Sequence, residues 1–80
     1  MTNNNGGKEM KPTKANIDKA LHAAGFPDDF EIVKGAGYIY FSGGNVMEWY
    51  ASSVMIPYLY LQTVEQWVEI AEALRDGECL

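Results

Sequence analysis

Hydrophobic periodicity changes twice along this 80-residue chain, from helical spacing to strict alternation and back to helical spacing. Near the N-terminus Ile17 begins an apolar series at i, i+3, i+4 and i+7, which is one face of an amphipathic helix. Thr13 follows a proline and can cap this helix, and Gly25 is placed to end it. The spacing therefore predicts a helix over 14–24.

The second helical pattern lies near the C-terminus. Thr63 and Gln66 form a T-x-x-Q capping box, which pairs side chains and backbone amides at the start of a helix. An apolar stripe follows, made of Val64, Trp67, Val68, Ala71 and Leu74. Gly77 closes the pattern, so we expect a helix over 64–75 with Trp67 in the core.

Between the helices the sequence alternates as strands do. FEIVK (30–34) and YIYFSGG (38–44) predict two strands separated by the flexible GAG, and the run WYASSVMIPYLY (49–60) predicts a third. In the third run Val54, Ile56 and Tyr58 are expected on one face. Pro57 indicates that this strand ends there or lies at an edge of the sheet.

These elements predict an α+β fold in the order helix, strand, strand, strand, helix. Short Gly-rich turns join the strands, so the sheet is expected to be antiparallel, with both helices packed on one of its faces. A chain of this size forms one domain, which we assign to residues 13–77, with flexible tails at 1–12 and 78–80.

The charge of the chain disfavours direct binding of nucleic acid. The net charge is −5, and all of it lies in residues 35–80, where six acids face a single Arg75. The stretch KGAGYIYF (34–41) comes close to an RNA-recognition signature, but Ala36 stands where that signature needs a base-stacking ring. The basic surface that would hold phosphates is also missing.

No catalytic or metal-binding pattern is visible. His22 and Cys79 are the single histidine and the single cysteine, and Ser52 and Ser53 lie outside any nucleophile motif. No apolar run reaches the length of a membrane span. We therefore expect a soluble cytoplasmic protein that is not an enzyme and has no cofactor.

Four acids recur along one edge of the C-terminal helix: Glu65, Glu69, Glu72 and Asp76. Successive members lie roughly 5 to 6 Å apart along the axis, comparable to phosphates along one strand of nucleic acid. One interpretation is a ladder that imitates DNA toward a basic partner. The other is a solvated helix face kept soluble by like charge.

The second candidate surface is the outer face of the sheet. With Ile39 and Phe41 beneath the helices, Tyr38 and Tyr40 point outward, beside Met55 of the neighbouring strand. Tyrosine and methionine are frequent in protein interfaces. The alternative interpretation is that tyrosines suit a solvated strand face.

The phrases KPTKANIDKAL, KGAGYIYF, ASSVMIPYLY and TVEQWVEIAEAL together resemble small proteins encoded by bacteriophages and other mobile elements. The resemblance covers about residues 11–75, and proteins of that setting include anti-CRISPR and other anti-defence inhibitors. It implies a stoichiometric inhibitor that binds a host protein or nucleoprotein complex in the host cytoplasm, as a monomer or weak homodimer. The alternative is an accessory phage protein that acts by self-association.

Overall fold

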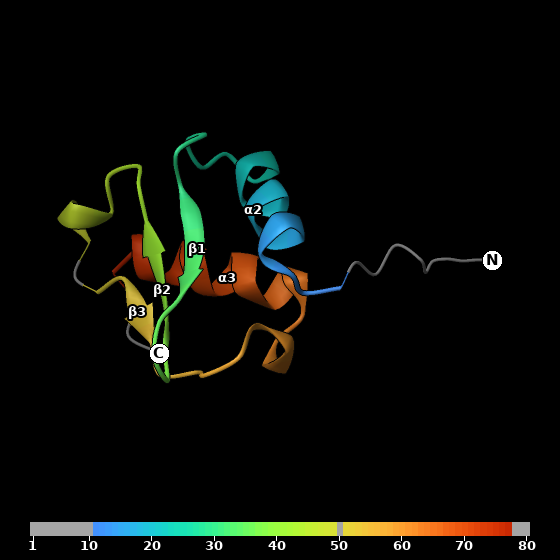
Figure 1. The fold of residues 1–80 in the computed structure, drawn as a ribbon. Coiled ribbons are helices and arrows are strands. Elements are labelled where there is room, and N and C mark those ends of the chain that lie inside the picture. The colour runs from blue at the N-terminus through green and yellow to red at the C-terminus, as the bar shows by residue number, and fades with distance from the viewer. Residues whose placement is uncertain (1–10, 50, 78–80) are drawn as a thin grey trace.

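The computed structural model describes residues 11–49 and 51–77, which form an α+β fold with two α-helices and a three-stranded sheet (Figure 1). The elements in chain order are α2 (Lys14–Ala23), β1 (Glu31–Lys34), β2 (Ile39–Ser42), the 3-10 turn η1 (Val46–Glu48), β3 (Ser53–Val54), the 3-10 turn η2 (Leu59–Leu61) and α3 (Val64–Arg75). The predicted class and order of elements are confirmed. Of the predicted tails, residues 1–10 and 78–80 lie outside the described residues.

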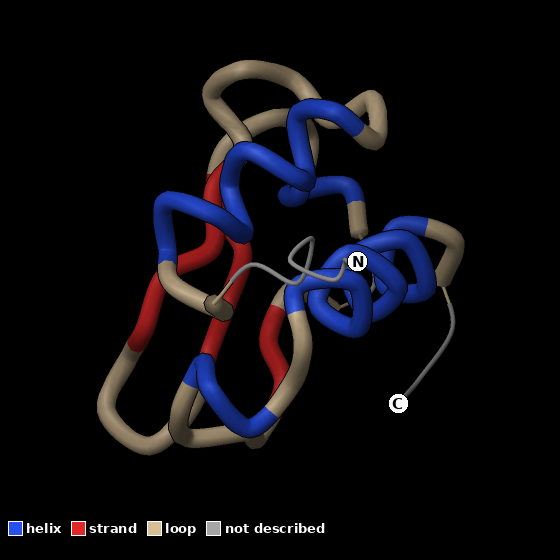
Figure 2. The backbone as a smooth tube through the Cα atoms, turned by 90° about the vertical axis from the view of Figure 1, so that its right-hand side faces the viewer, coloured by secondary structure: helices blue, strands red, loops and turns tan. Residues whose placement is uncertain are grey.

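The sheet has the strand order β1-β2-β3, and both pairs are antiparallel. Ile32 lies opposite Phe41, and Ile39 lies opposite Val54, so these four side chains share one face. In Figure 1, α3 runs behind the strands and α2 lies beside β1, while Figure 2 shows the strands on one side and α3 nearly end-on on the other. Both helices pack against the face that carries these four residues.

Both helices begin where their caps predict. Thr63 Oγ1 accepts from Gln66 N at 3.0 Å and Gln66 Oε1 accepts from Thr63 N at 2.8 Å, which completes the capping box of α3. Thr13 Oγ1 accepts from Asn16 N at 3.3 Å at the start of α2. The first helix ends at Ala23, one residue earlier than predicted, with Gly25 at a φ of +104°.

Both helices and the sheet share one core. The largest fully buried side chains are Trp67, Phe30, Phe41, Ile17, Leu21, Ile32 and Ile39. Trp67 is fully buried, as predicted, and its indole N–H donates to the carbonyl of Leu59 at 2.8 Å. The central residue of the core therefore also fixes the position of η2.

The third strand is present at an edge of the sheet, but it is much shorter than the run that predicted it. Of the described residues in the run 49–60, Ser53 and Val54 form β3, and the carbonyl of Ser52 accepts from Phe41 N at 2.9 Å. Trp49 follows η1 and packs its indole on Phe30 at 5.5 Å between ring centroids. Pro57 has no N–H to donate to a neighbouring strand. The indole N–H of Trp67 donates to the carbonyl of Leu59, which holds the following segment in the turn η2.

The side chains of α2 cover the outer edge of β1. Ile32 N donates to Asp18 Oδ1 at 2.8 Å, and Lys14 Nζ donates to Ile32 O at 2.9 Å. Lys14 also pairs with Asp18 Oδ2 at 2.9 Å and Glu31 Oε1 at 2.8 Å. Partial burial lowers the pKa of Lys14, but the bonds to these two carboxylates outweigh it and raise the pKa above its usual value. The charged lysine thus closes an edge that would otherwise offer free backbone groups.

Candidate protein-binding surfaces

Three acids of α3 and the C-cap residue Asp76 form a continuous outward-facing edge, which we call the acidic face (Glu65, Glu69, Glu72 and Asp76). All but Glu72 are exposed, and Glu72 is half-buried. Trp67 and Ala71, on the opposite side of the helix, are fully buried. The amphipathic pattern that buries one side of α3 therefore holds the four carboxylates on its other side.

Three carboxylates of the acidic face form no ion pair within the described part of the chain. In residues 11–49 and 51–77 no lysine, arginine or histidine forms a salt bridge with Glu65, Glu69 or Glu72. Asp76 Oδ1 accepts from Arg75 Nε at 3.2 Å, and the same guanidinium lies 5.2 Å from the centroid of the Phe26 ring. The negative field of this surface thus comes mainly from the first three members.

A shallow hollow of about 340 Å³ borders the acidic face. Its lining includes Glu69 together with Gln66, Ile70 and Ala73, all from α3. Ile70 and Ala73 are half-buried, so the hollow has an apolar wall next to a carboxylate. Lysine and arginine combine an apolar stem with a charged head, so this combination suits a basic side chain of a partner.

Tyr38 lies one residue before β2, Tyr40 lies within it, and the two rings contact each other. Tyr38 is 36% exposed, and Tyr40 is half-buried with its ring 5.8 Å from that of Tyr38. The Tyr38 ring lies against Gly35, where an added Cβ would come within 2.6 Å of the phenol carbon Cζ. Met55 is 83% exposed, but β3 ends one residue before it. The structure therefore brings the two tyrosines together and leaves Met55 just beyond the paired strand.

Two more exposed tyrosines escaped the sequence analysis. Tyr58 and Tyr60 flank Leu59 of η2, and their rings stack with centroids 5.3 Å apart and an interplanar angle of 13°. They are 46% and 69% exposed, and Leu61 beside them is 50% exposed. The letters PYLY at the end of the third predicted strand were the available signal, but alternation placed Tyr58 on the same face as Val54 and Ile56.

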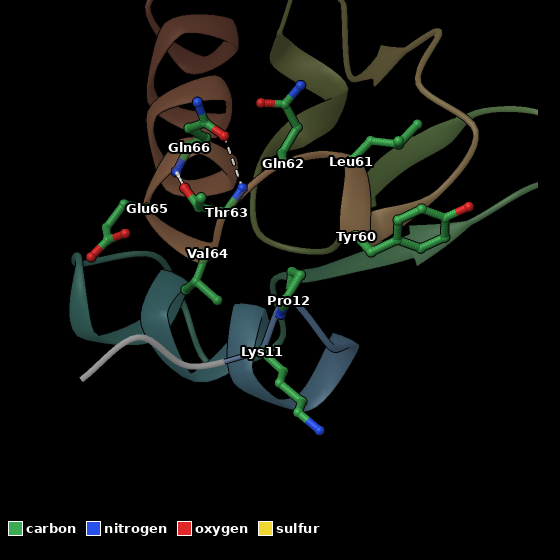
Figure 3. Close-up of a pocket in the computed structure, with 9 residues that line it drawn as sticks. All are labelled: Lys11, Pro12, Tyr60, Leu61, Gln62, Thr63, Val64, Glu65 and Gln66. Atoms are coloured by element: carbon green, nitrogen blue, oxygen red, sulfur yellow. Dashed lines mark hydrogen bonds between the residues drawn. The ribbon is translucent and has the colours of Figure 1, made fainter. Parts of the chain in front are cut away.

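A hollow of about 390 Å³ lies where η2 meets the start of α3 (Figure 3). Pro12, Tyr60 and Val64 contribute to its lining, and the dashed bonds of Figure 3 show the capping box beside them. The capping box occupies the backbone N–H groups of Thr63 and Gln66. These donors are therefore not available to an anion at the start of α3.

The described residues that could serve a catalytic or metal site do not form one. A ring nitrogen of His22, Nε2, lies 2.8 Å from the carbonyl oxygen of Phe30, and the histidine is half-buried rather than on the open surface. Cys79 lies outside the described residues. Over the described part of the chain, no three acidic or histidine side chains converge as metal ligands would. No helix in that part is long and apolar enough to cross a membrane.

Comparisons of the chain with protein families, with curated proteins and with solved structures find no match. The functional proposal therefore depends on the surfaces of the protein, and the acidic face presents three carboxylates that form no salt bridge within the described residues.

Proposed function

We propose that this protein is a stoichiometric, non-enzymatic inhibitor that binds a host defence nuclease complex through the acidic face of α3. The observation that carries the proposal is the row of Glu65, Glu69 and Glu72, which have no cation partner among the described residues. These three residues span about 10 Å along the helix axis. They would occupy a basic surface that the complex otherwise uses for nucleic acid.

The helix that presents these carboxylates is held rigid. Its N-terminus has a complete capping box, and its inner side is anchored by Trp67 and Ala71, which are fully buried. A rigid surface loses little conformational entropy on binding, so more of the interaction energy appears as affinity. Ile70 and Ala73 add apolar area beside Glu69, where the stem of a partner lysine or arginine would pack.

The alternative function is self-association through the outer face of the sheet. Met55, at 83% exposure, is the observation that favours it, together with the neighbouring Tyr38. Size-exclusion chromatography with light scattering separates the two functions. Self-association predicts a mass that rises with concentration and falls back to the monomer in the variant Met55→Ser, whereas the inhibitor remains monomeric over the same range.

The inhibitor proposal is tested by capture and then by titration. Immobilised protein should retain a nuclease complex from the lysate of a host that carries such a defence system. Titration of the purified complex should then abolish its binding of target DNA at about one inhibitor per complex. Because a phosphate mimic and DNA use the same basic surface, excess DNA should compete, and affinity should fall as salt rises. Capture that persists unchanged in excess DNA and in high salt would contradict the proposal.

A further inference from the structure

A groove of about 430 Å³ lies between η2 and the segment that precedes α2. It shares no residue with the acidic face, although the adjoining hollow of Figure 3 is lined in part by Glu65. Its lining comes from Lys11, Pro12 and Thr13 on one side and from Tyr58, Leu59 and Tyr60 on the other, with Lys34 at the end of β1. This volume falls within the range of small-ligand and peptide-anchor pockets. In the neighbouring hollow of Figure 3, Pro12 lies between Lys11 and Tyr60, which belong to both depressions.

The walls of the groove are apolar, and its charges are all positive. Lys34 Nζ lies 5.2 Å from the centroid of the Tyr58 ring, and the Tyr58 ring stacks on Tyr60. Among the described residues, no aspartate or glutamate lines the groove, although the chain as a whole carries a net charge of −5. Neither Lys11 nor Lys34 forms a salt bridge within residues 11–49 and 51–77. The groove is therefore a positively charged site on a protein whose net charge is negative.

We infer that this groove binds an acidic peptide segment of a partner protein, one that carries an apolar side chain between carboxylates. The apolar side chain would lie against Pro12, Leu59 and the outer face of Tyr60. The flanking carboxylates would meet the ammonium groups of Lys11 and Lys34. This site goes beyond the proposed inhibitor function, since it uses different residues and a partner of opposite charge.

The observed contacts favour a peptide over single-stranded nucleic acid. Lys34 and Tyr60 both contact the Tyr58 ring, so the outer face of Tyr60 is the one stacking surface that the groove would offer to a base. A nucleic-acid strand would also extend from the groove into the negative field of the rest of the chain. A short peptide with a few carboxylates interacts chiefly with charges within about 8 Å, which is the screening length at physiological salt.

The test uses three synthetic hexapeptides, blocked at both ends, and the full chain labelled for NMR. The peptide EELFEE carries the proposed chemistry, QQLFQQ keeps only its apolar pair, and EEAAEE keeps only its charges. We expect EELFEE to shift the resonances of Tyr58, Tyr60 and Lys34, and to bind at least fivefold more tightly than either control peptide. Lys34→Gln should weaken its binding about fivefold, while the matched variant Lys19→Gln, an exposed lysine outside the groove, should leave it unchanged.

Four results would overturn the inference. The first is the absence of shifts at the groove with millimolar EELFEE, and the second is equal binding of QQLFQQ. The third is tighter binding of an oligothymidylate to the same residues, which would assign the groove to nucleic acid. The fourth is a set of shifts at Tyr58 and Tyr60 that grows with protein concentration without peptide, which would assign it to a second copy of the chain. Circular dichroism of each variant shows that the fold is retained, and none of these results bears on the acidic face.

Discussion

The acidic face of α3 and the tyrosine face of the sheet contain the residues that the sequence singles out, yet the fold treats them differently. Glu65 and Glu69 remain exposed without a cation partner among the described residues, whereas Tyr38 lies on Gly35 and Tyr40 is half-buried. An aromatic ring gains free energy by covering neighbouring atoms of its own chain, but a carboxylate gains little unless a cation is near. Exposed charge is therefore the better guide to a free binding surface here.

The largest expected effect is a loss of stability of the hydrophobic core, which supports both surfaces. Trp67→Ala should lower the free energy of unfolding by about 3 to 5 kcal/mol, because it empties the centre of the core and frees the carbonyl of Leu59. For a domain of this size that is most of its stability. Thermal or urea denaturation checks this, and a variant that melts like the parent would contradict the assignment of Trp67 to the core.

Removal of a carboxylate that is hydrogen-bonded within the fold should lower the free energy of unfolding far more than removal of one of the unpaired carboxylates on α3. Asp18→Ala should cost about 1 to 2 kcal/mol, because it leaves the N–H of Ile32 without its acceptor and Lys14 without one of its two carboxylates. The matched change Asp28→Ala, at an exposed acid, should cost less than about 0.5 kcal/mol. Equal losses in urea denaturation would remove the distinction between bonded and free carboxylates.

The packing of Tyr38 can be broken without touching α3. In Gly35→Ala the new methyl group would overlap the far end of the Tyr38 ring, so the ring should move off the hairpin and become more exposed. Because a side chain and not the backbone must yield, we expect a cost of about 1 kcal/mol or less. Photo-oxidative labelling of Tyr38 should increase while that of Tyr60 stays constant. An unchanged Tyr38 signal would show that the ring does not rest on Gly35.

The smallest effect on stability is expected at the acidic face. Glu69→Lys with Glu72→Lys should change the free energy of unfolding by less than about 0.5 kcal/mol, because Glu69 is exposed, Glu72 is only half-buried, and neither forms a salt bridge among the described residues. A slight gain is expected, since the lysine introduced in place of Glu69 would pair with Glu65 one turn earlier. A melting point that falls by more than about 8 °C would mean that these residues support the fold.

The sequence predicted the elements whose signals are local. The capping box of Thr63 and Gln66 and the apolar stripe through Trp67 define α3, and the alternation around Ile39 and Phe41 defines β2. Such patterns depend only on neighbours within one or two turns or one strand. The acidic face could be predicted for the same reason, because helical spacing alone places its four members on one edge.

The segment after β3 could not be predicted in this way. Its path depends on the bond from the Trp67 indole to the carbonyl of Leu59, two residues that belong to different elements. Alternation alone placed Tyr58 on the same face as Val54 and Ile56, whereas the turn η2 brings Tyr58 and Tyr60 together at the surface. The groove beside them also needs Lys11 and Lys34, which approach it only in the folded chain.

A matched pair of charge reversals tests most directly whether the acidic face binds the nuclease complex. The measurement is the titration of a captured nuclease complex, at low and high salt, with the parent protein, with Glu69→Lys/Glu72→Lys, and with Asp28→Lys/Glu48→Lys. Both variants change the net charge equally, but only the first alters α3. The proposed function predicts that the α3 variant loses inhibition at both salt concentrations, while the control inhibits like the parent. Equal inhibition by both variants, with loss only in Tyr38→Ala/Tyr40→Ala, would contradict it and assign the interface to the sheet.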